Sequence, residues 1–282
     1  MWQYYAVSPI ENEKNTKITA VCIVVIANVF NPAKFLNMLK LFMDLYSQDC
    51  SPIPVLQSYL SIFTSKESRT SLGEFKLSDY NDKKALISSV TSLVKLFQLE
   101  VIAIWVAMLL KKRIFVYGSN VRELVDTIRS FPLLGTWHRQ NWNLLRPYVS
   151  SINAINEIKD LERAGVYVAG FTDEECANKT ELYDLYVDLT NGKVNIPKHA
   201  KSSFTLTKFH KQIASKFVKA AHTAKDQELI KIIAVKTKEL LDQLKTLSDE
   251  NGQITMQSLS ERNLPPNFDR FLYNLAVAEG IN

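Results

Sequence analysis

An aromatic and basic stretch in the middle of the chain has the composition of a protein-binding surface. It covers residues 131–149, FPLLGTWHRQNWNLLRPYV, of a chain of 282 residues. Tryptophan, tyrosine and arginine side chains carry most of the binding energy in protein interfaces. The candidate interface residues in this stretch are Trp137, His138, Arg139, Trp142 and Arg146. The alternative interpretation is that the aromatic rings pack in the core and that only Arg139 and Arg146 reach solvent.

A second candidate surface lies in a lysine-rich region near the C-terminus. Residues 198–245 contain eleven lysines and four acidic residues, an excess larger than the net charge of +5 of the whole chain. In the helix expected at 203–222, Phe209, Ile213 and Phe217 mark an apolar face. The cations that flank this face are Lys208, Lys211, Lys216 and Lys219. They suit an acidic partner or an anionic membrane, at about 1 kcal/mol per well-placed cation. The alternative is the solvated face of an ordinary amphipathic helix.

The chain lacks the short motifs of common catalytic and nucleotide-binding sites. It has no GxxxxGK phosphate loop, no GxSxG elbow and no protein-kinase signature. Its histidines show no metal-binding spacing, and its three cysteines form no CxxC pair. We therefore expect no metal, no cofactor and no chemical catalysis. We also expect no nucleic-acid partner, because the lysines are not interleaved with aromatic residues.

The composition is that of a globular protein in a reducing, cytoplasmic compartment. The chain is 46% hydrophobic and 22% charged, which is enough apolar material for a large core. The first residues lack the basic and apolar regions of a secretory signal. The length alone suggests about two domains.

The segment 99–118, LEVIAIWVAMLLKKRIFVYG, is expected to organise the core. Residues 99–110 are apolar on every side, which is typical of a buried helix. Residues 114–117 then predict a short buried strand. The three cations between them, at 111–113, are expected to cap the helix C-terminus, with a phosphate or acidic-partner site as the alternative. The apolar run of about 12 residues is shorter than the roughly 20 that span a bilayer.

The remaining pattern predicts an α/β protein. Strands are expected at 2–7 and 18–29, and the second is so apolar that it should be central in a sheet. Asn31 and Pro32 predict the start of a helix. Residues 64–84 are polar and aperiodic, which favours a mobile linker. Asn191 and Gly192 between apolar runs predict a hairpin, and the chain after residue 198 is expected to be helical.

Four short sequence motifs, in their order and spacing along the chain, resemble the DENN domain family. They are LLKKR with its strand, FP…WHRQNW…PY, YVAGF and DLYVDLTNGKV. The resemblance implies a DENN-type α/β fold with a longin-like N-terminal lobe and an α/β C-terminal lobe. The expected division is a partial longin-like lobe at 1–63, a linker at 64–84, the α/β lobe at 85–197 and a helical region at 198–282. The resemblance places Met1 partway through the first lobe.

DENN domains act as guanine-nucleotide exchange factors for Rab GTPases, so the resemblance implies a Rab partner and a place on late endosomes, peripheral to the membrane. Exchange needs no bond-making residue, because the factor binds the nucleotide-free GTPase better than the loaded one. The alternative that the resemblance also implies is a non-enzymatic binding subunit of an endosomal recycling assembly of the Commander type. Neither hypothesis assigns individual residues to the GTPase contact.

Overall fold

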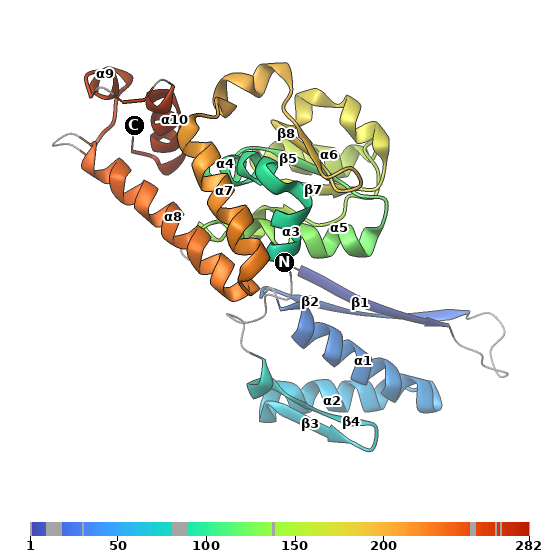
Figure 1. Cartoon of the computed structure of the whole chain (residues 1–282). Coiled ribbons are helices and arrows are strands. Elements are labelled where there is room, and N and C mark those ends of the chain that lie inside the picture. The colour runs from blue at the N-terminus through green and yellow to red at the C-terminus, as the bar shows by residue number, and fades with distance from the viewer. Residues whose placement is uncertain are drawn as a thin grey trace. The chain divides into compact units, whose positions relative to one another are not determined.

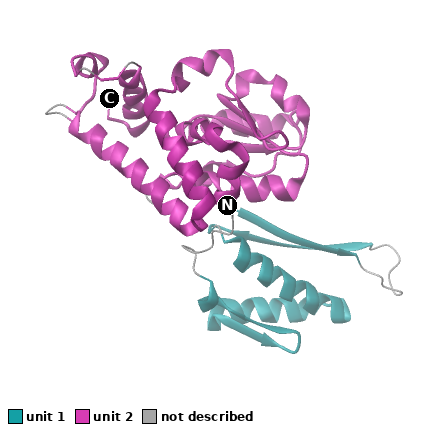
Figure 2. Ribbon diagram, viewed as in Figure 1, with its two compact units in different colours: residues 1–87 teal, residues 88–282 magenta. Residues whose placement is uncertain are grey.

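The computed structural model describes residues 2–9, 19–29, 31–80, 89–136, 139–248, 252–262, 264–265 and 267–281. The chain divides into two compact units, residues 1–87 and residues 88–282 (Figure 2). The elements of the first unit are β1 (Trp2–Pro9), β2 (Ala20–Ala27), α1 (Pro32–Asp49), α2 (Pro52–Ser65), β3 (Glu67–Thr70), β4 (Gly73–Lys76) and the 3-10 turn η1 (Leu77–Asp79).

In the first unit, α1 packs against one face of the antiparallel β1–β2 pair (Figure 1). The helix begins where the sequence predicts, since the Asn31 side chain accepts a hydrogen bond from the Lys34 amide at 3.1 Å and proline occupies the first turn. Tyr4 of β1 stacks on Phe35 of α1 with ring centroids 4.6 Å apart. This aromatic contact joins the sheet to the helix.

Strand β2 is not central, which corrects the expectation from its apolar sequence. Among the described residues it pairs only with β1. The face away from α1 carries Tyr5, Val24 and Ile26, which are 67%, 51% and 59% exposed. The apolar run therefore places large side chains on both faces, while a helix covers only one of them.

The structure also differs from the expected linker at 64–84. Residues 67–76 form the β3–β4 hairpin, in which Phe75 is buried and the Ser68 hydroxyl lies 2.8 Å from that of Ser58 in α2. This short hairpin exposes half of its residues and buries one apolar side chain, so its sequence shows no hydrophobic alternation. The last residues of the expected linker, 81–84, lie outside the described residues.

The second unit is a parallel sheet with helices on both faces, followed by a helical region (Figure 1). Its helices are α3 (Val90–Phe97), α4 (Val101–Leu109), α5 (Val121–Ile128), α6 (Ile155–Ala164), α7 (Lys208–Thr223), α8 (Asp226–Thr246), α9 (Met256–Ser260) and α10 (Phe268–Glu279). Its strands are β5 (Ile114–Tyr117), β6 (Leu145–Arg146), β7 (Val168–Phe171), β8 (Leu185–Asp188) and β9 (Lys193–Asn195). Its 3-10 turns are η2 (Gln98–Glu100), η3 (Phe131–Leu134), η5 (Trp142–Leu144), η6 (Glu174–Asn178), η7 (Thr180–Leu182) and η8 (Lys198–Phe204).

The sheet order is β6-β7-β5-β8-β9, and only β9 runs antiparallel to its neighbour. Successive residues of β5 and β7 face opposite sides of the sheet. Phe115 and Phe171 pack in a cluster with Leu161 of α6. Gly170 faces Ile128 of α5 on the other side. The sheet is therefore covered on both faces, which explains why all four residues of β5 are buried.

Helix α4 lies in the core of the second unit, as its all-round apolar sequence predicts. The Trp105 indole donates a hydrogen bond to the Thr237 hydroxyl of α8 at 3.1 Å, and its ring meets that of Phe217 of α7 edge to face. By length and composition alone the helical segment Val90–Leu109 could cross a membrane, but 61% of it is buried inside the protein. Core helices pass the same test, so this segment is weak support for a membrane span.

The basic triplet after α4 ends the helix and then forms specific contacts with later segments. Lys111 adopts a left-handed conformation, and the Lys112 amide donates to the Ala107 carbonyl at 2.9 Å. The Arg113 guanidinium donates to both carboxylate oxygens of Asp184, at 3.0 and 3.2 Å. Lys111 and Lys112 thus terminate the helix through backbone bonds, while the side chains of Lys111 and Arg113 form tertiary contacts.

The predicted hairpin at Asn191 and Gly192 is confirmed as the β8–β9 turn. Asp188 pairs with Lys193, and its carboxylate accepts hydrogen bonds from the amides of Thr190 and Asn191. Gly192 has a φ of +61°, and a Cβ there would lie 2.9 Å from the Leu96 carbonyl oxygen. Glycine is required at this position both for its backbone conformation and for space.

Candidate functional site

Helix α7 presents the predicted lysines because one stripe of its residues is buried inside the unit. The buried residues of α7 are His210, Ile213, Ala214, Phe217 and Ala221. Their spacing of three and four residues forms one stripe, so the residues between them face outward. The helix begins with a capping box, in which the Thr207 amide donates to His210 Nδ1 at 3.1 Å.

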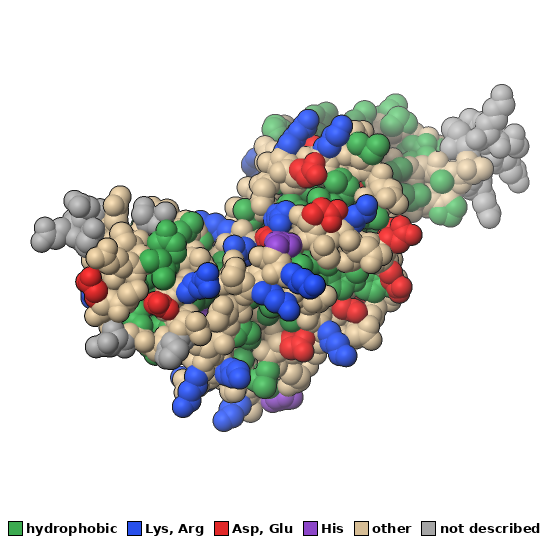
Figure 3. Space-filling model, turned by 90° about the horizontal axis from the view of Figure 1, so that it is seen from above, with side chains coloured by type: hydrophobic (Ala, Val, Ile, Leu, Met, Phe, Trp, Pro, Cys, Tyr) green, Lys and Arg blue, Asp and Glu red, His purple; other side chains and the backbone are tan. Residues whose placement is uncertain are grey.

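The four predicted lysines all lie on the exposed side of α7, and we call them the lysine face. They are Lys208, Lys211, Lys216 and Lys219. Helix α7 contains no acidic residue, and none of the four lysines forms an ion pair with any residue that the structure describes. The space-filling view shows Lys and Arg side chains at many places on one face of the molecule, with hydrophobic side chains between them (Figure 3). The charge of the lysine face is therefore available to a partner.

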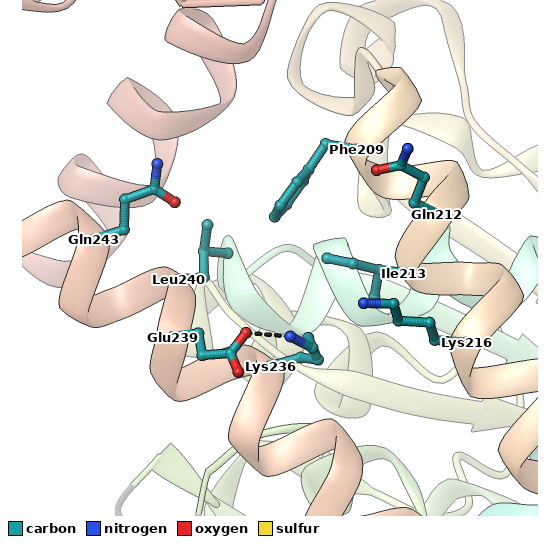
Figure 4. Close-up of a pocket in the computed structure, with 8 residues that line it drawn as sticks. All are labelled: Phe209, Gln212, Ile213, Lys216, Lys236, Glu239, Leu240 and Gln243. Atoms are coloured by element: carbon teal, nitrogen blue, oxygen red, sulfur yellow. Dashed lines mark hydrogen bonds and ion pairs between the residues drawn. The ribbon is translucent and has the colours of Figure 1, made fainter.

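A groove of about 120 Å³ lies between α7 and α8, beside the lysine face (Figure 4). Phe209 and Ile213 of α7 face Leu240 of α8 across it, so its inner surface is apolar. The residues that line it are Phe209, Gln212, Ile213, Lys216, Lys236, Glu239, Leu240 and Gln243. Lys216 belongs to both the groove and the lysine face.

The polar residues of the groove are divided between paired and unpaired groups. Lys236 and Glu239 form an ion pair one turn apart on α8, so their charges largely cancel. Gln212 and Gln243 are exposed at the rim, and each offers an amide donor and an acceptor. Lys216 is the groove residue that brings a positive charge without a described acidic partner.

The aromatic and basic stretch is arranged differently from either interpretation of its sequence. Trp137 and His138 lie outside the described residues. The Arg139 side chain is only 9% exposed; its Nη1 lies 2.6 Å from Glu279 Oε1 and its Nη2 donates to the Leu109 carbonyl at 2.9 Å. The expectation that Arg139 reaches solvent is therefore wrong, because α10 supplies a carboxylate that the local sequence does not show. Burial lowers the pKa of Arg139, and Glu279 opposes that shift.

The remaining candidates of this stretch lie nearer to the surface. Trp142 is half-buried in η5, and Tyr148 is exposed. Arg146 is half-buried and donates to the carbonyls of Asn143 and Leu145, at 2.8 and 2.9 Å. These bonds leave part of the Arg146 guanidinium at the surface, so this end of the stretch can still contact a partner.

Sequence reasoning missed the cluster formed by Arg113, Asp184 and His199. The carboxylate of Asp184 accepts from Arg113 and lies 3.3 Å from His199 Nε2. Burial alone would raise the pKa of Asp184, but the hydrogen bonds from Arg113 outweigh it and lower that pKa. Arg113 and Asp184 directly precede β5 and β8, which pair with Ile114 opposite Leu185. The contact is predictable only once the two strands are known to be parallel neighbours.

The second residue that the sequence did not single out is His210, which is fully buried. Its ring meets the Phe271 ring of α10 edge to face, with centroids 4.4 Å apart. Nδ1 accepts the capping hydrogen bond from Thr207, whereas Nε2 has no hydrogen-bond partner among the described residues. Burial lowers the pKa of His210 from 6.5 to about 4, because the imidazolium would lose its hydration.

We expect His210 to make the stability of the protein depend on pH. Its folded-state pKa of about 4 lies below its ordinary value of 6.5, so the unfolded chain binds the proton first. The stability is full above pH 6.5 and falls by about 3 kcal/mol as the pH drops towards 4. Urea unfolding at a series of pH values measures this loss.

The matched variant is His210→Gln, because glutamine at the same capping-box position can accept the Thr207 amide without titrating. Carboxylates titrate in both proteins, so the informative quantity is the difference in unfolding free energy between them. That difference should change between pH 6.5 and 4 and be constant above pH 7. Parallel curves for the two proteins would contradict the assignment.

Within the described residues, His, Cys, Asp and Glu side chains form no group of three or more that could hold a metal ion. The candidate site consists of three surface features: the lysine face, the groove beside it, and the outer end of the aromatic stretch at Trp142 and Arg146.

Comparison with known proteins places both units in one family. Residues 87–198 match the SPA family, described as "Stabilization of polarity axis". DENN domain-containing protein 10 of Danio rerio is 34% identical over 98% of this chain and 81% of its own length. The proteins of the same name from Dictyostelium discoideum and Homo sapiens are 36% and 33% identical, over 94% and 93% of this chain and 74% and 75% of their own lengths.

The chain belongs to the DENN domain-containing protein 10 family. Its mixed fold with a parallel sheet is a DENN-type fold, as the resemblance of its motifs predicts. The SPA match ends at residue 198 and so covers the sheet of the second unit but not α7 or α8. The similarity to the DENN domain-containing protein 10 relatives, in contrast, extends over nearly the whole chain, including the region of the lysine face.

Proposed function

We propose that this chain is a guanine-nucleotide exchange factor for a Rab GTPase, acting in the cytoplasm and peripherally on late endosomes. The observation that carries the proposal is the relationship to DENN domain-containing protein 10 over 93–98% of the chain, which includes both compact units. The DENN resemblance of the motifs implies this activity. An exchange factor needs an interface and no bond-making residue, which agrees with the kind of site that the second unit presents.

Exchange would follow from differential binding. A factor that binds the nucleotide-free GTPase more tightly than the loaded one shifts the GTPase towards nucleotide release. The switch segments and Mg²⁺ that hold the nucleotide then lose their contacts. Among the described residues of the predicted interface, Trp142 and Arg146 at the outer end of the aromatic stretch are the accessible ones. Arg139 is excluded from a direct role because its charge is used within the second unit.

The test is the release of fluorescent GDP from a panel of Rab GTPases in the presence of the full chain. We expect one or a few Rab proteins to release GDP faster. Arg146→Glu should reduce that acceleration by about ten-fold, as loss of an interface anchor does. The matched control is Arg163→Glu on α6, where the arginine is highly exposed. The proposal fails if no Rab in the panel responds, and the interface assignment fails if the two variants behave alike.

The second candidate function is a non-enzymatic binding subunit of an endosomal recycling assembly of the Commander type. One observation favours it: the lysine face and the adjoining groove lie on α7 and α8, whereas Trp142 and Arg146 of the aromatic stretch lie in η5 and β6. A surface of this kind can hold a partner whether or not exchange takes place. Binding and exchange can therefore be measured separately.

A further inference from the structure

We propose that the groove between α7 and α8 binds an acidic segment of a partner protein, which inserts one aliphatic side chain between the two helices. The inference rests on the proposed role as a binding subunit and names the chemistry of the partner. It joins two features that lie side by side, an apolar hollow and a face of lysines that have no acidic partner among the described residues.

The size of the groove selects the inserted group. Its volume of about 120 Å³ is smaller than the cavity of about 150 Å³ that holds a benzene molecule. Phe209, Ile213 and Leu240 provide apolar walls from both helices (Figure 4). A leucine, isoleucine or methionine side chain fits this space. One such anchor in a pocket is the usual centre of a binding hot spot.

The charge around the groove selects the flanking residues of the partner. Lys216 stands at the groove itself, and Lys208, Lys211 and Lys219 extend the positive charge along α7. From residue 208 to 219 the helix rises by roughly 16 Å, the length of a three-turn helix or of five extended residues. Acidic residues on both sides of the anchor would meet these lysines. Gln212 and Gln243 at the rim can hydrogen-bond to the same carboxylates or to the partner backbone.

A protein segment fits this surface better than a membrane does. A helix that lies on a bilayer buries an apolar face among the lipid chains. The apolar stripe of α7 is instead buried inside the second unit, and the large hydrophobic side chains that the described part of the chain exposes include none from α7. The lysine face could attract anionic lipid by charge alone, but the groove is a hollow and cannot insert into a bilayer.

The experiment is a selection of binders to the full-length chain from a displayed library of random 16-residue peptides. We expect the enriched peptides to share acidic residues around one Leu, Ile or Met. In synthetic copies, replacing that residue by alanine should weaken binding by about ten-fold or more, because a buried aliphatic side chain is lost. The affinity should also fall as salt is added.

Variants of the chain locate the binding site. Gln243→Trp adds a large side chain at the exposed rim and should fill the groove without disturbing the core. The double variant Lys211→Glu with Lys219→Glu reverses two charges of the lysine face. Its matched control is Lys231→Glu with Lys238→Glu, which changes the same charge on exposed positions of α8 that turn away from the groove.

The proposal holds if peptide binding falls about ten-fold or more with Gln243→Trp and with the α7 double variant but not with the α8 double variant. Selected peptides without the acidic and aliphatic pattern, or equal binding to the groove-filled variant, would overturn it.

Vesicles of phosphatidylcholine and phosphatidylserine form a second arm. If they bind the chain in a way that depends on the α7 lysines while no peptide is selected, the surface is a membrane surface and the proposal is wrong. Failure of the groove proposal and failure of the exchange proposal are distinguished by measuring GDP release with Gln243→Trp. This variant can lose peptide binding at the groove and still accelerate GDP release.

Discussion

Replacement of Gly170 by alanine should strongly destabilise the second unit. A Cβ at this position of β7 would lie 2.4 Å from the Pro147 carbonyl oxygen and 2.5 Å from Ile128 Cδ1. The isoleucine can change rotamer, but the carbonyl belongs to the backbone that leads into the next helix. Strand β7 pairs with a strand on each side and has little freedom to move. We expect a loss of about 3 kcal/mol in unfolding free energy, the upper range for overpacking.

Urea unfolding followed by circular dichroism measures this loss, and a fall in Tm of roughly 6–12 °C should accompany it. The matched control is Gly135→Ala in the same unit, where the nearest atom to a new Cβ lies at 3.6 Å, an ordinary contact distance. Equal urea midpoints for the two variants would show that the approach of α5 and the Pro147 segment to β7 is looser than the structure has it.

The second large effect is expected at the buried ion pair between Arg139 and Glu279. Arg139→Met leaves a carboxylate that is only 23% exposed without its main cation, and it removes the hydrogen bond to the Leu109 carbonyl. Loss of one partner of a buried pair costs about 3–5 kcal/mol. Lys111 Nζ lies 3.9 Å from the same carboxylate oxygen and partly compensates, so we expect a value near 3 kcal/mol.

A second substitution separates the ion pair from general damage. Glu279→Leu removes the stranded charge, so the double variant with Arg139→Met should regain most of the stability that the single variant loses. Arg163→Ala is the surface control, because its pair with Asp160 is exposed and should contribute less than about 1 kcal/mol. A double variant no more stable than Arg139→Met alone would mean that the packing of the arginine stem, rather than its charge, holds α10.

The parts of the fold that the sequence predicts are those in which local pattern and tertiary role agree. Helix α4 is apolar on all sides and is buried on all sides. The hairpin at Gly192 and the helices α7, α8 and α10 also follow from local signals that no distant segment overrides. The lysine face is predictable for the same reason, since the apolar stripe of α7 determines which residues point outward.

Apart from the β3–β4 hairpin, the failures share one physical cause, which is that the residues that decide the structure lie in a distant segment. The apolar sequence of β2 says nothing of how many neighbours the strand has. The burial of Arg139 depends on Glu279, which lies 140 residues further along the chain. The contact of Arg113 with Asp184 depends on the order of the strands in the sheet. The groove needs two helices side by side, so no single stretch of sequence contains it. The four lysines of the lysine face could be named in advance, but the adjoining groove could not.

The burial of α4 has a consequence for how the protein is made. Trp105 of this helix reaches its partner Thr237 only after 132 further residues have been added. At a synthesis rate of about 5–20 residues per second, the most apolar helix of the chain waits roughly 7–26 s on the ribosome before α8 exists to cover it. Strand β5 likewise waits for β7 and β8, because parallel neighbours come late in the sequence. A segment that is buried in the finished protein is thus exposed to aggregation and to chaperones while the chain is being synthesised.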